Sequence, residues 1–261
     1  MKQTILLHDS QSNCSKGMNK FLIEGINAMS NTEVLFSKFH GKLFGTYQKY
    51  KFSSLVWHIS EYTQELYDFI RDYDNSVKIY LVVDGSLDSE FISYINKTNI
   101  NVILKSNIEN NYTKVVCTFD NLYDDTIFFN ANLVRNNKIV VLLSKNNQKN
   151  TELLSDIIYP KTNRPIVLMN NPEYQSEVNI GVFNYPDLAD ILNTYGGVVD
   201  LDQNYILESQ ATGIDHYDTI NNSIVDAIDN SRLTEKITNI QNKTYKYFID
   251  KYLIPHIMGD R

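Results

Sequence analysis

Apolar residues along the chain fall into short runs that alternate with segments of helical spacing. The first run covers residues 5–7, and the polar residues 8–16 that follow it predict a loop. One face of a helix then carries Met18, Phe21, Leu22, Ile26 and Met29. This beginning predicts a strand, a loop and a helix.

The same alternation continues as far as residue 118. It predicts strands at 34–36, 55–59, 77–83, 102–104 and 115–118, and helices at 62–73 and 88–96. Strands separated by ten to fifteen helical residues favour parallel pairing with crossover helices. We therefore expect the first half of the chain to form one α/β domain.

A polar stretch at residues 130–137 interrupts the pattern, and a second cycle follows it. This cycle predicts strands at 139–143, 166–169, 179–183 and 198–199, and helices at 151–159 and at 187–195, the latter opened by Pro186. From Ser223 onward the spacing predicts helices with one buried face, made by Leu233, Ile237, Ile240, Tyr247 and Phe248.

The expected fold class is therefore α/β, with two Rossmann-like domains and a helical C-terminal segment. We place the first domain at residues 1–135, the second at 136–222, and the C-terminal helices, which would pack back across the domains, at 223–261. A chain of 261 residues with 43% hydrophobic residues can bury one large core or two modest ones.

The remaining composition indicates a soluble cytoplasmic protein. No apolar run approaches the roughly 20 residues of a membrane span, and the run at 5–7 is too short for a signal peptide. The two cysteines, Cys14 and Cys117, are too few for a disulfide framework and lack metal-ligand spacing. We therefore expect a reducing compartment and no bound metal.

Charge is distributed unevenly along the chain. The net charge of -7 argues against simple charge-driven binding of nucleic acid. Residues 38–58, called here the basic-aromatic segment, nevertheless contain no acid. They carry Lys38, His40, Lys42, Lys49, Lys51 and His58, interleaved with Phe39, Phe44, Tyr47, Tyr50, Phe52 and Trp57. The segment is either a strand and loop with core aromatics or a surface for an acceptor molecule.

The most informative stretch runs from Asp200 to Gly213. An apolar run ends at Val199, Asp200 follows it, and Glu208 stands eight positions later where a helix should begin. A strand and a helix start that bring two carboxylates to one crevice can hold a sugar nucleotide. The plainer interpretation of Glu208 is an acid in the first turn of a helix, where the helix dipole favours it.

This stretch resembles the second domain of the retaining, nucleotide-sugar-dependent GT-B glycosyltransferases. Their Glu-x7-Glu motif runs into Glu-Ala-x-Ala-x-Gly, which Asp200 and residues 208–213 match. The family's strand followed by a basic pair resembles residues 139–143 with Lys145 and Lys149, and residues 181–188 match a further strand and loop. The chain departs from the family in having Asp as the first acid and no glycine between the two acids.

The resemblance implies a role for each matching residue. Glu208 would accept hydrogen bonds from the ribose hydroxyls, Asp200 would contact the transferred sugar, and Ser209 would belong to the same donor site. Lys145 and Lys149 would stabilise the leaving diphosphate without a metal, or else be solvated loop residues.

In the first domain, the loop that opens the first helix would bring Lys16 and Gly17 to the donor, and His58 would be a cleft histidine or a structural one. The implied donor is UDP-glucose, with no other cofactor.

The acceptor stays open at this point. The basic-aromatic segment and the small size are similar to the DNA glucosyltransferases of T-even-type bacteriophages, which work in the host cytoplasm. That similarity implies that Lys42, Lys49, Lys51 and Trp57 contact DNA carrying hydroxymethylated or glucosylated cytosine. A glycan or lipid-linked saccharide of the cell envelope is the alternative acceptor.

Two further functions remain as alternatives. Asp200 and Asp202 also read as the Asp-x-Asp motif of metal-dependent GT-A glycosyltransferases, although only residues 203–261 would follow to hold an acceptor. A non-catalytic nucleotide-binding module could use the same fold. The sequence contains no Gly-x-Gly-x-x-Gly after a predicted strand and no Walker lysine motif, which disfavours a dehydrogenase or a nucleoside triphosphatase.

Overall fold

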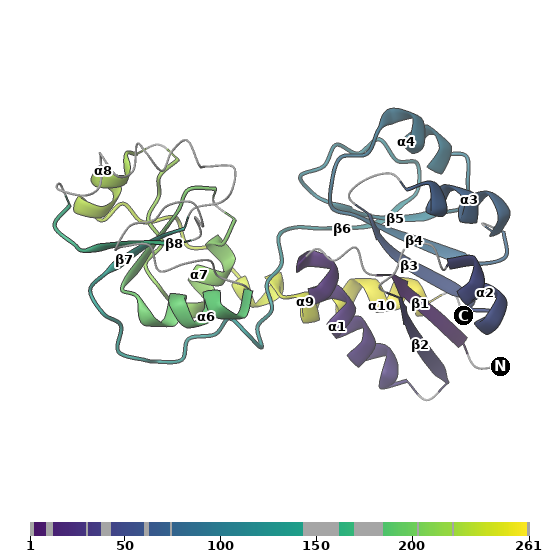
Figure 1. Ribbon diagram of the computed structural model, residues 1–261, viewed down its shortest axis with the longest axis horizontal. Helices are drawn as coiled ribbons and strands as arrows, with labels where there is room; N and C mark the ends of the chain where they lie inside the picture. The colour runs from purple at the N-terminus through teal and green to yellow at the C-terminus, as the bar shows by residue number, and fades with distance from the viewer. Residues whose placement is uncertain are drawn as a thin grey trace. The chain divides into compact units, whose positions relative to one another are not determined.

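The computed structural model describes residues 3–8, 13–29, 31–37, 43–59, 63–73, 75–142, 162–169, 185–202, 204–220 and 222–259. The chain divides into two compact units (Figure 1). The first unit consists of Met1–Leu122 together with Gln241–Arg261, and the second is Tyr123–Ile240. Among the described helices, none combines the length and apolarity that a membrane span requires.

The first unit is built on a six-stranded sheet in which every pair of neighbours is parallel. Its strands are β1 (Gln3–His8), β2 (Thr32–Ser37), β3 (Ser54–Ile59), β4 (Lys78–Val83), β5 (Asn101–Lys105) and β6 (Val115–Phe119). Their order across the sheet is β2-β1-β3-β4-β5-β6. Strand β2 lies on one side of β1 and strand β3 on the other, so the strand order reverses between β1 and β3.

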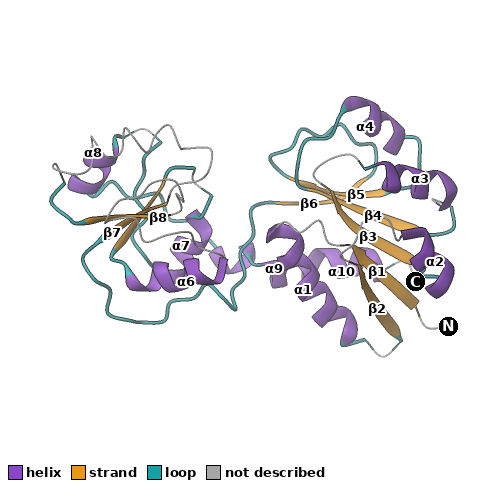
Figure 2. Ribbon diagram, viewed as in Figure 1, coloured by secondary structure: helices purple, strands orange, loops and turns teal. Residues whose placement is uncertain are grey.

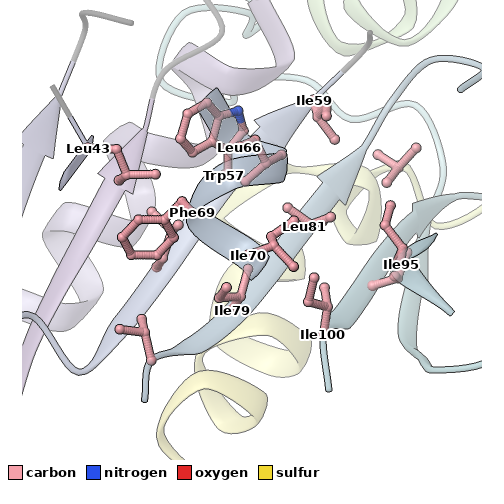
Figure 3. Close-up of a cluster of buried hydrophobic side chains, with 14 of the residues drawn as sticks. Leu43, Trp57, Ile59, Leu66, Phe69, Ile70, Ile79, Leu81, Ile95 and Ile100 are labelled. Atoms are coloured by element: carbon pink, nitrogen blue, oxygen red, sulfur yellow. The ribbon is translucent and has the colours of Figure 1, made fainter. Parts of the chain in front are cut away.

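Helices cover both faces of this sheet (Figure 2). They are α1 (Asn13–Asn27), α2 (Leu43–Tyr50), α3 (Gln64–Tyr73) and α4 (Ser89–Ile95). Helices α2, α3 and α4 pack with Leu55, Trp57 and Ile59 on one face, where Figure 3 shows part of the cluster. Helix α1 packs with Val56 on the opposite face. Strand residues alternate between the faces, and since both faces are covered, β3 is buried along its whole length.

The C-terminal residues complete the face of the sheet that α1 covers. They form η2 (Ile240–Lys243), α9 (Tyr245–Phe248), the π-helical η3 (Ile249–Leu253) and α10 (Ile254–Met258). Phe248, Ile249 and Leu253 lie in the same cluster as α1. The Tyr80 hydroxyl in β4 donates to the backbone carbonyl of His256, 2.7 Å away. Residues far apart in sequence therefore build one core.

The second unit contains a three-stranded parallel sheet of β7 (Ile139–Leu142), β8 (Ile166–Met169) and β9 (Gly197–Asp200), in the order β8-β7-β9. The helices α6 (Tyr185–Thr194) and α7 (Ile206–Thr212) pack on one face with Val140, Leu142 and Val198. Helix α8 (Ile224–Asp229) packs on the other. The expected helix at 151–159 and strand at 179–183 lie outside the described residues.

The α/β class and the parallel pairing are confirmed, and three local predictions are wrong. Helix α1 begins at Asn13, inside the stretch expected to be a loop. Helix α2 occupies residues 43–50 of the basic-aromatic segment, where one of the two interpretations expected a loop before the strand at 55–59. The helical prediction fails at residues 232–234, where the backbone pairs with 216–218 and Leu233 is 46% exposed.

Candidate functional site

The carboxyl edge of the second sheet is where the structure gathers the acids that the sequence singled out. Leu142, the last residue of β7, pairs with Asp200, the last residue of β9. The strand order β8-β7-β9 reverses between these two strands. In open parallel sheets, ligands bind beyond the carboxyl ends of the strands at such a reversal. Asp200 therefore lies at the position that this fold favours for a ligand.

The Asp200 side chain organises the turn between β9 and α7. Its carboxylate accepts a hydrogen bond from the backbone N–H of Tyr205 at 2.6 Å and another from Asp202 at 3.3 Å. Asp200 is only 2% exposed, and this burial raises its pKa to about 6 although the backbone donors, including the N–H of Asn204, oppose the shift. Asp200 thus has a structural role in the turn, beside the sugar contact that the resemblance implies.

Glu208 stands in the first turn of α7, one turn beyond that loop. Its Oε1 accepts a hydrogen bond from the Tyr185 hydroxyl at the start of α6, 2.8 Å away. The residue is 5% exposed, and burial raises the pKa of its carboxyl to about 7 against the hydrogen bonds from Tyr185 and from its own backbone N–H. Buried carboxyls with a pKa near neutrality are frequent in functional sites.

Tyrosines surround the two acids. The pKa values of Tyr123 and Tyr205 are raised, first by burial and then by nearby acids that include Glu208. Ser209 is fully buried, and its hydroxyl donates to the Tyr205 carbonyl at 2.6 Å. The expected donor residue Ser209 therefore fixes the start of α7. The two acids therefore lie among tyrosine side chains, and aromatic residues are common in small-molecule sites.

The arrangement can accept hydrogen bonds from a polyol. An ionised Glu208 offers two oxygens, of which Oε1 already accepts from Tyr185. The two oxygens of a carboxylate offer about four acceptor positions, so hydroxyls of a pentose or hexose could bind in addition to Tyr185 and the backbone N–H of Glu208. Within the described part of the chain, no three His, Cys, Asp or Glu side chains group as metal ligands.

Sequence reasoning gave no role to Tyr185, the residue that orients Glu208. It lies 23 positions before Glu208, at the start of a different helix. The only available signal was a tyrosine directly before the Pro186 that opens the helix. The sequence contains no signal that pairs the Tyr185 hydroxyl with the Glu208 carboxylate.

The basic residues expected at the donor and acceptor sites are described only in part. Lys145, Lys149 and Lys42 lie outside the described residues. Lys49 and Lys51 are exposed at the end of α2, where the Nζ of Lys49 lies 4.9 Å from the Tyr50 ring centroid and that of Lys51 lies 4.9 Å from the Tyr47 centroid. Their position is compatible with contact to an anionic acceptor.

Trp57 and His58, expected at the acceptor and the donor, are buried in the first unit. Trp57 is 1% exposed and stacks on His8, with ring centroids 3.7 Å apart and planes 1° from parallel. His58 is fully buried and, as the next residue in the strand, points to the opposite face. The two side chains therefore cannot serve one shared surface, and Trp57 has a packing role.

Gly17 also differs from its expected place. It lies within α1, with Lys16 exposed beside it, and not in a loop before the helix. A Cβ added to Gly17 would come 2.5 Å from the Cε2 of Tyr245. Tyr245 is itself 5% exposed, so its ring has little room to move. The glycine lets α1 and α9 approach closely.

We expect Gly17→Ala to destabilise the protein by about 1–3 kcal/mol, because overpacking outweighs the helix preference of about 1 kcal/mol for alanine over glycine. Gly45→Ala is the matched control, since its Cβ would meet no atom within 4 Å in α2. This control should be neutral or stabilising. Urea unfolding of both variants measures the difference, and equal stabilities would contradict the close packing.

Comparison of the chain with protein-family models and with curated proteins finds no significant match to either.

Proposed function

We propose that the protein is a retaining glycosyltransferase that binds a nucleotide sugar, UDP-glucose in the first instance, at the carboxyl edge of the second sheet. The observation that carries the proposal is the buried Glu208 carboxyl, held by the Tyr185 hydroxyl beside the strand end at Asp200. A carboxylate in a partly dry site can accept from both hydroxyls of a ribose, as the resemblance of this stretch implies.

The reaction would exchange one bond at the anomeric carbon for another. The acceptor oxygen forms a bond to that carbon while the bond to the diphosphate oxygen breaks, on the same face of the sugar. The proton of the acceptor hydroxyl passes to the departing diphosphate, so no protein nucleophile is assigned. In this proposal Lys145 and Lys149 stabilise the negative charge that grows on the diphosphate.

The acceptor part of the proposal uses the first unit. Lys49 and Lys51 at the exposed end of α2, together with Lys42, would contact the phosphates of modified DNA. A screen of radiolabelled nucleotide sugars against hydroxymethylated DNA, glucosylated DNA and glycan acceptors tests the function. Transfer to glycans alone would exclude the DNA acceptor, and nucleotide binding without transfer to any acceptor would favour a binding module.

The pKa of Glu208 gives a prediction for donor binding. Because that pKa is about 7 in the free protein, the carboxyl is mostly neutral at pH 6 and mostly ionised at pH 8. The ionised form accepts hydroxyl hydrogen bonds better, so the affinity for UDP should rise by about tenfold from pH 6 to pH 8. Calorimetric titration of UDP at several pH values measures this slope.

The control for this titration is Glu208→Gln, whose side chain does not ionise. Its weaker affinity for UDP should lose most of the pH dependence, apart from the part that UDP itself contributes through its own phosphate ionisation. An affinity in the unsubstituted protein that is flat or falls with pH would contradict a role for the ionised Glu208 carboxylate.

A further inference from the structure

A pocket lies in the first unit, at the amino ends of its strands. It has a volume of about 610 Å³, within the range of sites for small molecules. Lys78 and Asn101 begin β4 and β5, and Lys114 directly precedes β6. Since ligands of parallel sheets usually bind at the carboxyl ends, this pocket is separate from the place where the fold favours a nucleotide.

Basic side chains from three parts of the chain line this pocket. They are Lys78 and Lys114 from the sheet edge and His256 from α10. Among the described lining residues there is no carboxylate. In a chain with a net charge of -7, a pocket whose described lining includes two lysines and a histidine but no acid is unlike the average surface.

Two asparagines of the pocket lining form hydrogen bonds at this sheet edge. The Lys114 Nζ donates to the Asn99 Oδ1 at 2.8 Å, which orients the ammonium without neutralising its charge. Asn101 is 5% exposed, and its amide donates to the Ile79 carbonyl at 3.4 Å. The pocket floor is therefore fixed by the sheet, which reduces the ordering cost of binding.

The position of His256 is fixed by the core. The hydroxyl of Tyr80, which is 1% exposed, donates to the His256 carbonyl, so α10 is attached to β4 at this residue. Figure 1 shows α10, in yellow, alongside the first sheet. His256 is exposed and lines the pocket.

We propose that this pocket binds a small organic phosphate, with the phosphate between Lys114, Lys78 and His256 and the rest of the ligand along the Asn99 and Asn101 amides. Lysine is a strong phosphate ligand that acts as a point charge, and amides suit the hydroxyls of a sugar. The ligand class is a phosphate ester of about the size of a pentose phosphate. The proposal does not depend on the transferase function.

Calorimetric titration of the full chain with ribose 5-phosphate tests the proposal, with ribose as the uncharged probe. One ester should bind per chain, and ribose should bind at least about tenfold more weakly, because charged hydrogen bonds are lost. Lys114→Gln combined with His256→Gln should weaken the ester by at least about tenfold. Both side chains are exposed, so the double variant should keep its melting temperature.

Two control variants separate this pocket from other sources of binding. Lys97→Gln removes an exposed lysine of the same unit outside the pocket and should leave affinity within about twofold. Glu208→Gln alters the proposed donor site and should leave ribose 5-phosphate binding unchanged, so failure of one proposal does not imply failure of the other.

Four results would overturn the inference. The first is no uptake of ribose 5-phosphate, and the second is equal affinity in the protein and the double variant. The third is binding only to vesicles of phosphatidylcholine with phosphatidic acid, which would assign the basic groups to a lipid headgroup and not to a small ester. The fourth is a loss of affinity in Lys97→Gln as large as that in the double variant, which would show general attraction to positive charge and not a specific site.

Discussion

Glu208→Gln should weaken UDP binding by about 100-fold and, at pH 8, raise the stability of the protein. The affinity falls because an amide offers one acceptor oxygen where the carboxylate offers two, and because hydrogen bonds to a charged group are the stronger ones. That oxygen can still accept from Tyr185, so the substitution leaves the geometry of the two helices in place.

The gain in stability follows from the raised pKa. The unfolded carboxyl ionises with a pKa near 4.5, whereas the folded one ionises near 7, so between these values the folded state binds more protons. The free energy of unfolding therefore falls as pH rises through this window, by up to about 3 kcal/mol. Because glutamine does not ionise, the free energy of unfolding of Glu208→Gln should exceed that of the unsubstituted protein at pH 8 but not at pH 4 to 5.

Urea titrations followed by circular dichroism at pH 5 and pH 8 measure the stability, and calorimetry measures UDP affinity. Glu235→Gln is the matched control, since it removes the same charge from an exposed position of the same unit. It should change neither quantity by more than the small effect typical of surface charges. UDP affinity that survives in Glu208→Gln would contradict the donor site. A free energy of unfolding that is unchanged at pH 8 would contradict the burial and the raised pKa of the Glu208 carboxyl.

Trp57→Ala should lower the free energy of unfolding of the first unit by about 3–5 kcal/mol, the usual cost of removing a large buried aromatic side chain. Trp57 packs among the side chains of β3, β4 and α3 (Figure 3) and stacks on His8. No neighbour in a sheet covered on both faces can move far enough to fill the cavity.

Tyr50→Ala serves as the control within the same basic-aromatic segment. Tyr50 is 47% exposed, so its loss should cost less than about 0.5 kcal/mol. Circular dichroism is the suitable signal, because Trp57 is the only tryptophan and its replacement removes the fluorescence probe. Equal stabilities of the two variants would mean that Trp57 lies at the surface, as an acceptor contact requires.

Local sequence patterns were sufficient to predict the parallel strands. Runs such as 55–59 and 79–83 are largely apolar and do not alternate with polar residues, because both faces of the sheet are covered. Helix α2 could not be predicted in this way. It buries only Leu43, contains Gly45, and is tied at its first residue by a bond from the Leu43 N–H to the Glu65 carboxylate of α3. A contact between residues 22 positions apart leaves no local signal.

The helical prediction for the C-terminal segment failed around Leu233 for a similar reason. Leu233 fits a helical face by spacing, yet its backbone forms a bridge to Tyr217. Ser223 and Thr244 each cap a new short helix, so the residues between them are not one element. Spacing alone cannot distinguish a broken helix from a continuous one when the competing partner is distant in sequence.

At the candidate site, the spacing of Asp200 and Glu208 placed both acids at one strand end and the following helix. Their burial and raised pKa values depend on the tertiary structure, above all on the Tyr185 hydroxyl, which the sequence does not connect to them. The pattern could suggest which residues meet, but their protonation follows only from what surrounds them.

The first unit draws on both ends of the chain, since residues 241–259 complete the face of its sheet that α1 covers. On the ribosome, the six strands and α1 emerge well before the C-terminal helices that pack in the same cluster as Val56 and Ile103. The second unit is one uninterrupted stretch of the chain. It can finish folding before the C-terminal helices are available to pack on the first sheet. Translation order therefore leaves part of one side of the sheet uncovered until residues 241–259 have been made.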